Sequence, residues 1–302
     1  MGIAMARYLG GEIVSADSRQ VYRDMDIGTA KPTPQQRAAV PHHLVDIINP
    51  DEPFSLALYQ ERSLEAIADI TARGRVPLLV GGTGQYLAAV LEGWNVPRVE
   101  PQHELRATLE QEALERGAEA LYARLVRVDP QAATTISPQN VRRMIRALEV
   151  YQVTGQPISA QQTRHPPPYS IATCWLTLPT EMLYTRIDAR VDAMMAAGLL
   201  EEVQRLLAKG CHWGCSAMSS LGYIQFRPFF EGKASLETCV QRLKYDTHRF
   251  ARQQKGWFRR LPGVVRVLSP PTLTPPPALP ETPPGCPPPS PPAAAPASAP
   301  RS

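Results

Sequence analysis

The chain has 302 residues, of which 43% are hydrophobic, and this supports a real core in one large domain or two modest ones. It contains no apolar run of the roughly 18 residues that a membrane span needs, so we expect a protein outside the membrane. Its 32 Lys and Arg residues exceed its 28 Asp and Glu residues by a net charge of +4, which is too small to indicate nucleic-acid binding unless the cations cluster.

The first third of the chain alternates strand patterns with helix patterns. Residues 4–9 have the pattern of the last turns of a helix, and residues 12–16 have that of a short buried strand. A helix is predicted at 55–73, and further strands are predicted before and after it, at 44–47 and 76–80. Strands that alternate with helices predict a parallel sheet with helices on its faces.

The middle of the chain has helix patterns only. Three helices are predicted there, at 104–116, 118–128 and 138–154. Ser137 and Pro138 are typical of a helix start, with the serine as cap and the proline as the first helical residue. We therefore expect an all-helical insertion in the α/β core.

The last third returns to mixed patterns. Strands are predicted at 171–178 and 264–267, and helices between them at 182–197, 200–208 and 235–260. Residues 269–302 hold fifteen of the 32 prolines and no aromatic residue, which predicts a disordered tail. A partner that docks on its Pro-rich runs is the alternative to a solvated tail.

These patterns divide the chain into four parts. We predict a first part of the core at 1–101, a helical insertion at 102–165, a second part of the core with a basic helix at 166–268, and the Pro/Ala-rich tail at 269–302.

The five cysteines occur without a secretory signal pattern, which indicates reduced thiols in a cytoplasmic protein. Cys211 and Cys215 invite a zinc hypothesis, but no second ligand pair follows at finger spacing.

Two polar side chains lie where predicted strands end. Ligands bind at the carboxyl ends of strands in open α/β sheets, so Asp17, which follows the strand at 12–16, is a candidate general base. An aspartate that caps a turn is the alternative. Thr83 follows the strand at 76–80 in a glycine-rich turn, where a backbone can approach a ligand and a hydroxyl can donate or accept a hydrogen bond. Such turns also occur for packing reasons alone.

Cationic side chains gather at three places. Arg186 and Arg190 lie at i and i+4 on one helix face, where a bound anion would offset their repulsion. The other two groups lie on predicted helices: Arg242, Arg249, Arg252, Lys255 and Arg259 at 235–260, and Arg142, Arg143 and Arg146 at 138–154. Such stripes are either solvated faces or phosphate-binding surfaces.

Several of these motifs together resemble the tRNA dimethylallyltransferase family. They are the run from Gly10 to Pro32, the Gly-Gly-Thr turn at 81–83, the arginine-rich run 140–149, Gly222-Tyr223 and the ending 257–260. The resemblance implies a P-loop-NTPase-like parallel sheet flanked by helices. It also implies transfer of a dimethylallyl group from dimethylallyl diphosphate to the exocyclic amine of the adenine next to the anticodon in tRNA, with Mg²⁺ as the ion.

The resemblance also implies roles for individual residues. Asp17 is expected to be the general base with Thr83 beside it, and Arg190 is expected to bind the diphosphate, with Lys31 as a further phosphate contact. The residues expected to contact tRNA are Asp17, Ser18, Arg19 and Gln20 at the extruded adenine, and Arg142, Arg143, Arg146, Arg249 and Arg252 elsewhere.

The family carries a strand and a phosphate-binding loop, G-x-x-x-x-G-K-S/T, just before the run at Gly10, whereas this sequence starts at Met1. We therefore expect the 302-residue chain alone to be impaired, and a remnant that binds tRNA without turnover is one alternative. An ATP-binding small-molecule or nucleotide kinase of the phosphate-loop class is another. An enzyme that prenylates a free adenine nucleotide is a third, which the cluster at Arg142 disfavours. A monomer is expected.

Overall fold

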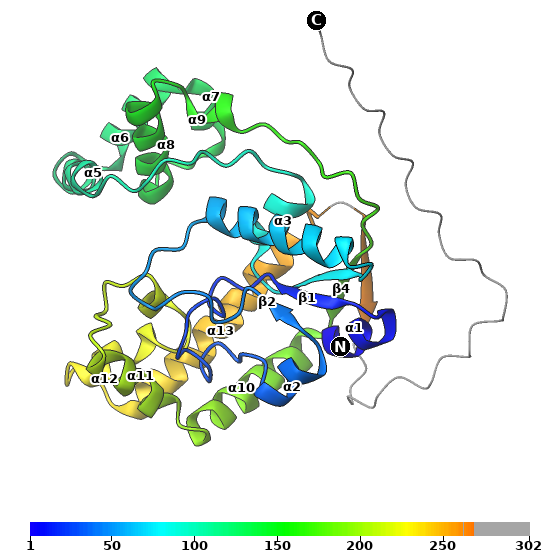
Figure 1. Ribbon diagram of the computed structural model, residues 1–302. Coiled ribbons are helices and arrows are strands. Elements are labelled where there is room, and N and C mark those ends of the chain that lie inside the picture. Colours follow the sequence, from blue (N-terminus) through cyan, green and yellow to red (C-terminus); the bar gives the residue numbers. More distant parts are fainter. Residues whose placement is uncertain (262, 269–302) are drawn as a thin grey trace, which may run out of the picture. The chain divides into compact units, whose positions relative to one another are not determined.

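The computed structural model describes residues 1–261 and 263–268, and these fall within one compact unit. In the first sheet, β1 (Glu12–Ser15) lies between β2 (His42–His43) and β3 (Pro77–Val80), and in the second, β4 (Thr173–Thr177) pairs with β5 (Val264–Leu268) (Figure 1). All these pairs are parallel, which confirms the predicted α/β class. The tail predicted at 269–302 lies outside the described residues.

In Figure 1, α3 lies above the strands of the first sheet, and Ala6 of α1 packs against Ile13 of β1 and Leu78 of β3. The helices of the core are α1 (Gly2–Leu9), α2 (Pro34–Ala39), α3 (Leu56–Ala72), α4 (Gly84–Leu91), α10 (Thr180–Ala196), α11 (Leu199–Ala208), α12 (Arg227–Phe230) and α13 (Leu236–Phe258). Two short 3₁₀ helices, at Ala217–Ser219 and Ile224–Phe226, lie between α11 and α12.

One predicted strand is absent from the structure. The strand expected at 44–47 does not form, and the pairing partner of β1 is His42–His43 instead. Leu44 and Asp46 have φ angles of 62° and 58°, in the left-handed region, so the chain turns repeatedly where an extended strand was expected. The strand β3 does form where predicted, but its last residue Val80 is 37% exposed, so it is not buried over its whole length.

The segment predicted as a helical insertion contains only helices. They are α5 (His103–Arg116), α6 (Ala118–Val128), α7 (Pro130–Thr135), α8 (Val141–Thr154) and α9 (Ile158–Gln161). They pack around a separate apolar cluster that includes Leu109, Leu121 and Met144. The predicted start of α8 at Pro138 is wrong by three residues, because the Asn140 side chain accepts a hydrogen bond from the Arg143 amide at 3.2 Å and so caps the helix.

The two chain segments that join this helical segment to the core run side by side. Trp94 and Arg164 form an antiparallel bridge, and the Asn95 amide donates to the Thr163 carbonyl at 2.9 Å. Within the segment, the buried carboxylate of Glu149 accepts hydrogen bonds from Arg106 through both of its oxygens. Burial alone would raise the pKa of Glu149, but hydrogen bonds from Arg106, the Gln102 amide and Arg146 hold it at about 2.

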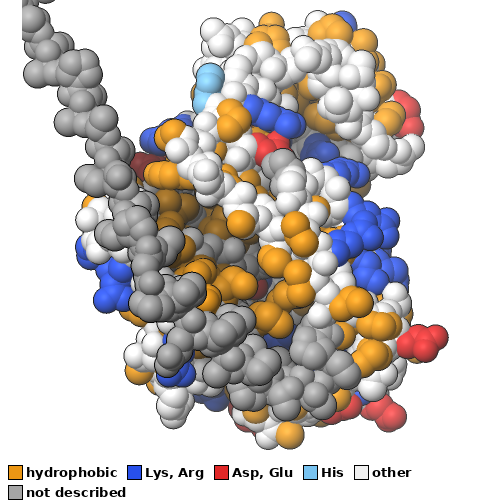
Figure 2. Space-filling view, turned by 90° about the vertical axis from the view of Figure 1, so that its right-hand side faces the viewer, with side chains coloured by type: hydrophobic (Ala, Val, Ile, Leu, Met, Phe, Trp, Pro, Cys, Tyr) orange, Lys and Arg blue, Asp and Glu red, His pale blue; other side chains and the backbone are white. Residues whose placement is uncertain are grey.

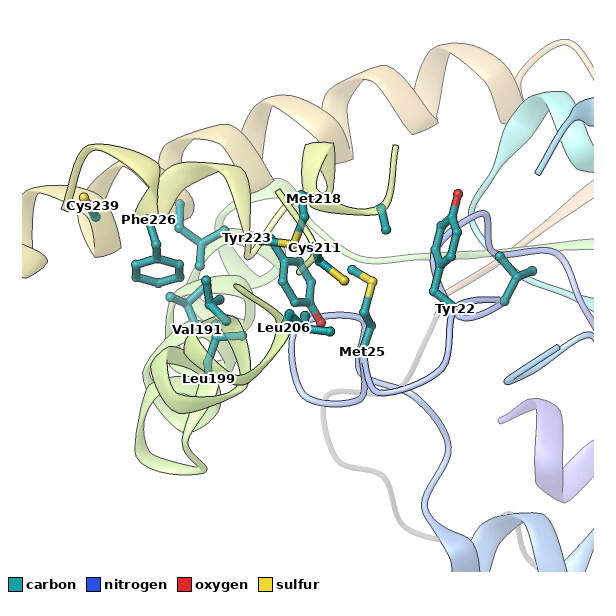
Figure 3. Packing of buried hydrophobic residues seen from close by; sticks show 14 of the residues in the cluster. Tyr22, Met25, Val191, Leu199, Leu206, Cys211, Met218, Tyr223, Phe226 and Cys239 are labelled. Atoms are coloured by element: carbon teal, nitrogen blue, oxygen red, sulfur yellow. The ribbon is translucent and has the colours of Figure 1, made fainter. Parts of the chain in front are cut away.

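The largest apolar cluster lies beside the loop that follows β1. Figure 3 shows the side chains of Met25, Leu206 and Tyr223 next to one another within it. A second cluster, which includes Val14 and Tyr59, fills the space between the first sheet and the helices α3 and α4. Both clusters therefore border the segment that leaves the carboxyl end of β1.

A buried carboxylate fixes the other end of β1. Glu12 is 2% exposed and receives hydrogen bonds from both terminal nitrogens of Arg73, while His43 Nε2 lies 2.7 Å from its Oε2. Arg73, more than any other group, lowers the pKa of Glu12 to about 2. The start of β1 is thus tied to the end of α3 and to β2.

Candidate active site

The site is built on the residues that leave β1. Ser15 and Ala16 are buried, and the next residue, Asp17, is only partly buried. Asp17 Oδ1 accepts hydrogen bonds from the amides of Arg19, at 2.8 Å, and Gln20, at 3.4 Å. Asp17 therefore does cap a turn, but with Oδ1 only, and Oδ2 has no hydrogen bond to any of the described residues. One carboxylate oxygen is thus fixed while the other stays available to a ligand.

The turn after β3 brings Thr83 to the same place. The Thr83 amide donates to the Ala16 carbonyl at 3.0 Å, and its Oγ1 accepts from the Ser18 amide at 3.0 Å and donates to the Ser18 hydroxyl at 3.3 Å. A Cβ at Gly81 would lie 2.2 Å from the Ala16 carbonyl oxygen, so only glycine permits this approach. Thr83 occupies the N-cap position of α4, yet its side chain makes no cap hydrogen bond. Its hydroxyl instead joins the two strand ends.

The electrostatic environment of Asp17 combines burial with a nearby cation. Burial raises the pKa of the Asp17 carboxyl above its usual value, while the hydrogen bonds from the Arg19 and Gln20 amides and the charges of Arg19 and Arg190 work against that rise. Burial likewise lowers the pKa of Arg190, and Asp17 raises it. Arg190 on α10 and Asp17 therefore lie within each other's electrostatic field. The sequence-based prediction that both residues serve one site needs them to be this near to each other.

A cavity of about 460 Å³ opens between the loop at 26–37 and α10. Cationic Arg190 and Arg37 lie in its wall together with apolar side chains, among them Ile27, Pro32 and Met194. Cavities of a few hundred cubic ångströms with few polar groups suit small ligands. This one offers a cation for an anionic group and an apolar wall for a short hydrocarbon.

The structure argues against a phosphate contact by Lys31. Its side chain is 2% exposed, and Nζ donates to the Tyr22 carbonyl at 2.9 Å, to Asp26 at 2.6 Å and to Asp46 at 2.5 Å. An ammonium group has three donors, and all three are used. Lys31 therefore holds the loop together rather than presenting a free charge, which corrects the sequence-based prediction.

Sequence reasoning missed the residue that anchors this loop. Glu202 on α11 is 1% exposed, and its carboxylate accepts from the amides of Asp26, Ile27 and Gly28 at 2.9–3.1 Å and from the Tyr223 hydroxyl at 2.6 Å. The ring of Tyr223 packs so closely on Gly28 that a Cβ there would lie 2.5 Å from it. The only hint in the sequence is a glutamate on the apolar side of an amphipathic helix.

Two residues next to Asp17 also make structural contacts. The side-chain Nε2 of Gln20 donates to the carbonyls of Thr29, at 3.3 Å, and Ala30, at 3.4 Å, and the Arg19 guanidinium donates to the Ser216 carbonyl at 2.8 Å. The predicted adenine contacts at 17–20 thus divide into two kinds. Asp17 and Ser18 lie beside Thr83, whereas the side chains of Arg19 and Gln20 brace neighbouring loops.

The arginines predicted to contact nucleic acid also differ in their surroundings. Arg142 and Arg143 are exposed on α8 and form no ion pair within the described residues, and the same is true of Arg249 on α13. Arg146 instead pairs with Glu149 at 2.6 Å and donates to the carbonyls of Pro97 and Val99. Its guanidinium therefore holds the segment that enters the helical insertion, and this corrects the prediction that it faces tRNA.

On α13 the predicted basic stripe is partly neutralised. Arg242 pairs at 3.0 Å with Asp246, an acidic residue that lies between the arginines of the stripe. Arg252 donates to the Tyr184 hydroxyl at 2.8 Å. The side of the molecule in Figure 2 shows groups of Lys and Arg side chains beside exposed hydrophobic ones. Cationic surface is therefore present, but fewer of its charges are free than the sequence predicts.

The described residues, Cys211 and Cys215 among them, contain no group of three or more His, Cys, Asp or Glu side chains that could hold a metal ion. Among the described helices none is both long and apolar enough to cross a bilayer.

Fold and site together define an α/β protein with the polar side chains of Asp17, Ser18 and Thr83 at the carboxyl ends of two paired parallel strands. The chain belongs to the IPP transferase family, whose model matches residues 20–261. This confirms the resemblance drawn from the motifs.

Individual relatives agree with that assignment. The tRNA dimethylallyltransferase of Roseiflexus castenholzii is 67% identical over 265 residues, which cover 88% of this chain and 87% of the relative. That of Chloroflexus aggregans is 62% identical over 264 residues, which cover 87% and 89%.

Two solved structures are similar as well. The tRNA isopentenylpyrophosphate transferase of Bacillus halodurans has a TM-score of 0.64 at 39% identity and matches 88% of this chain and 84% of its own. A eukaryotic dimethylallyltransferase acting on tRNA has a TM-score of 0.74 at 28% identity, over 88% and 69%.

Proposed function

We propose that the protein transfers a dimethylallyl group from dimethylallyl diphosphate to the exocyclic amine of the adenine next to the anticodon in tRNA. The observation that carries this proposal is Asp17, whose Oδ2 has no hydrogen bond within the described residues. Asp17 precedes Ser18, which Thr83 contacts, and it lies in the field of Arg190. The names of relatives at 62–67% identity support the same reaction.

Asp17 supplies the base. An exocyclic adenine amine is a weak nucleophile because its lone pair is delocalised into the ring, so a carboxylate that accepts a proton as the bond forms assists the attack. The new N–C bond forms while the C–O bond to the diphosphate breaks, the amine proton passes to Asp17 Oδ2, and the bonding electrons leave with the diphosphate. Burial raises the pKa of Asp17, which makes it a stronger base than an exposed aspartate.

Arg190 stabilises the leaving group. Negative charge develops on the diphosphate as the C–O bond breaks, and a positioned cation lowers the energy of that state. Arg190 lies in the wall of the cavity described above, where apolar side chains can contact the five-carbon chain. The hydroxyls of Ser18 and Thr83 then orient the reacting groups.

Mg²⁺ fits this site as a companion of the donor rather than as a resident of the protein. It commonly binds through one or two carboxylates, several waters and substrate phosphates, and the described residues lack a three-ligand cage. Asp17 is the carboxylate that we expect to approach it. Bound to the diphosphate, Mg²⁺ would neutralise part of its charge.

The RNA substrate requires a surface for phosphates and an extruded base. An enzyme that modifies a stacked base takes it out of the stack, and the exposed charges of Arg142, Arg143, Arg249 and Arg252 can hold the backbone meanwhile. We also propose that the protein acts as a monomer in the cytoplasm. The free thiols of the four described cysteines fit a reducing compartment.

The test compares Asp17→Asn with wild type in the native protein, using labelled dimethylallyl diphosphate and an anticodon stem-loop RNA. We expect a loss in kcat of roughly 10²–10⁴-fold, the usual contribution of a general base, with unchanged RNA affinity. Asp51→Asn, at an exposed aspartate, serves as the control. Retained turnover in Asp17→Asn would refute the assignment. If wild type prenylated free AMP as well as it prenylates the RNA, the proposed acceptor would be a free adenine nucleotide and not tRNA.

A further inference from the structure

The last turns of α13 close on the turn that carries Thr83. Gln254 Nε2 donates to the Gly82 carbonyl at 3.0 Å. A Cβ at Gly82 would lie 2.3 Å from that same nitrogen, and one at Gly84 would lie 2.5 Å from Trp257 Cγ. Gly84 therefore lets the helix and the turn meet at this distance, and a side chain at Gly82 would displace the Gln254 amide group.

The turn that carries Thr83 also contacts the residues on either side of Asp17, the proposed catalytic carboxylate. Thr83 follows Gly82 directly, its amide donates to the Ala16 carbonyl, and its Oγ1 accepts from the Ser18 amide, both at 3.0 Å. Asp17 lies between these two partners in the chain. Any shift of the turn away from α13 therefore moves the residues on both sides of Asp17.

We propose that Gln254 is a positioning residue for prenyl transfer. It holds the Gly82 carbonyl and so fixes the Thr83 hydroxyl and the direction of the Asp17 carboxylate, and this inference rests on the proposed function. Packing alone does not require it, because Trp257 and Phe258 already join the end of α13 to the apolar cluster under β1. The distinct contribution of Gln254 is one directed N–H donor.

Three variants separate positioning from packing. Gln254→Met keeps the length of the side chain and removes the donor, and Gln254→Glu keeps the shape but places a carboxylate against the Gly82 carbonyl. Gln253→Met makes the first change at the exposed neighbouring glutamine. We expect Gln254→Met to lose roughly ten- to a hundredfold in kcat, the usual effect of a displaced catalytic group, while the KM values stay within about twofold.

Gln254→Glu adds a readout that a packing role would not change. An ionised carboxylate repels the Gly82 carbonyl, whereas a protonated one donates an O–H to it. The kcat of Gln254→Glu relative to wild type should therefore rise as the pH falls, and the same ratio for Gln253→Met should stay flat. A flat ratio for Gln254→Glu, or wild-type kcat in Gln254→Met, would overturn the inference.

Amide hydrogen exchange keeps this test independent of turnover. Loss of the Gln254 donor should speed exchange of the Thr83 amide, while Gln253→Met should leave it unchanged. A native protein that does not prenylate RNA would contradict the proposed function, and the exchange result would still decide whether Gln254 holds the turn. Unchanged Thr83 exchange in Gln254→Met, or a fall in kcat that only follows global unfolding, would overturn the inference.

Discussion

Glu202→Gln is the substitution that should most clearly show how the cavity loop is held. In the wild type, Oε2 accepts from the amides of Asp26 and Ile27, and Oε1 accepts from the Gly28 amide and the Tyr223 hydroxyl. A glutamine has one oxygen and one NH₂ group in the same space. In either orientation of the glutamine amide group, its NH₂ faces at least one of the backbone N–H groups, which then has no acceptor.

The expected loss follows from these four hydrogen bonds. A charged acceptor makes hydrogen bonds about twice as strong as a neutral one, so each bond that survives loses about 1 kcal/mol. A buried donor left without an acceptor costs about 1–3 kcal/mol more. Allowing for relaxation of the exposed part of the loop, we expect a loss of about 3–5 kcal/mol, a large share of the roughly 5–15 kcal/mol by which domains are stable.

The measurement is urea unfolding of wild type, Glu202→Gln and Glu201→Gln. Glu201 is the exposed neighbour on the same helix, so its substitution changes the same charge without touching the loop and should shift stability by less than about 0.5 kcal/mol. Because the loop at 26–37 lines the cavity, the KM for dimethylallyl diphosphate should also rise in Glu202→Gln. Unchanged or increased stability of Glu202→Gln would refute this reasoning, because the cost of burying the carboxylate would then equal or exceed its hydrogen bonds.

Two further predictions concern acid stability and RNA binding. The pKa of Glu12 is lowered to about 2 from 4.5, so its stabilising contribution should be complete above about pH 4.5 and decline as the pH falls toward 2, and Glu12→Gln should flatten that part of the stability–pH curve in urea unfolding. Arg142→Ala should weaken RNA binding and reduce the slope of log Kd against log salt by about 1, as expected for a lost phosphate contact. Arg146→Ala should instead lower the melting temperature, because it leaves Glu149 with one cation fewer, and equal salt slopes in the two variants would contradict this division.

The meeting of Asp17 and Thr83 could be predicted because it follows from local patterns. Parallel strands end at the same edge of a sheet, so residues that follow two neighbouring strands must lie close together. The helices with long periodic patterns were predicted within a few residues for the same reason. The strand expected at 44–47 was wrong because Leu44 and Asp46 adopt left-handed φ angles, which apolarity alone does not show.

Local patterns could not predict which charged residues are free to bind a ligand and which are paired within the fold. Lys31 is neutralised by Asp26 and Asp46, and the latter lies fifteen positions away. Glu202 binds amides more than 170 positions earlier in the chain. A sequence shows that a charge exists, but only the tertiary fold decides whether that charge is free for a ligand or already used in a long-range contact.

The coupling between Asp17 and Arg190 gives the proposed reaction an order. The positive charge of Arg190 lowers the pKa of Asp17, against the effect of burial. A diphosphate bound at Arg190 brings negative charge that cancels this influence, so the pKa of Asp17 rises when the donor is present. The same diphosphate also displaces water from the cavity, which strengthens the remaining electrostatic interactions. For the proposed base Asp17, this effect favours binding of dimethylallyl diphosphate before the proton of the adenine amine is taken.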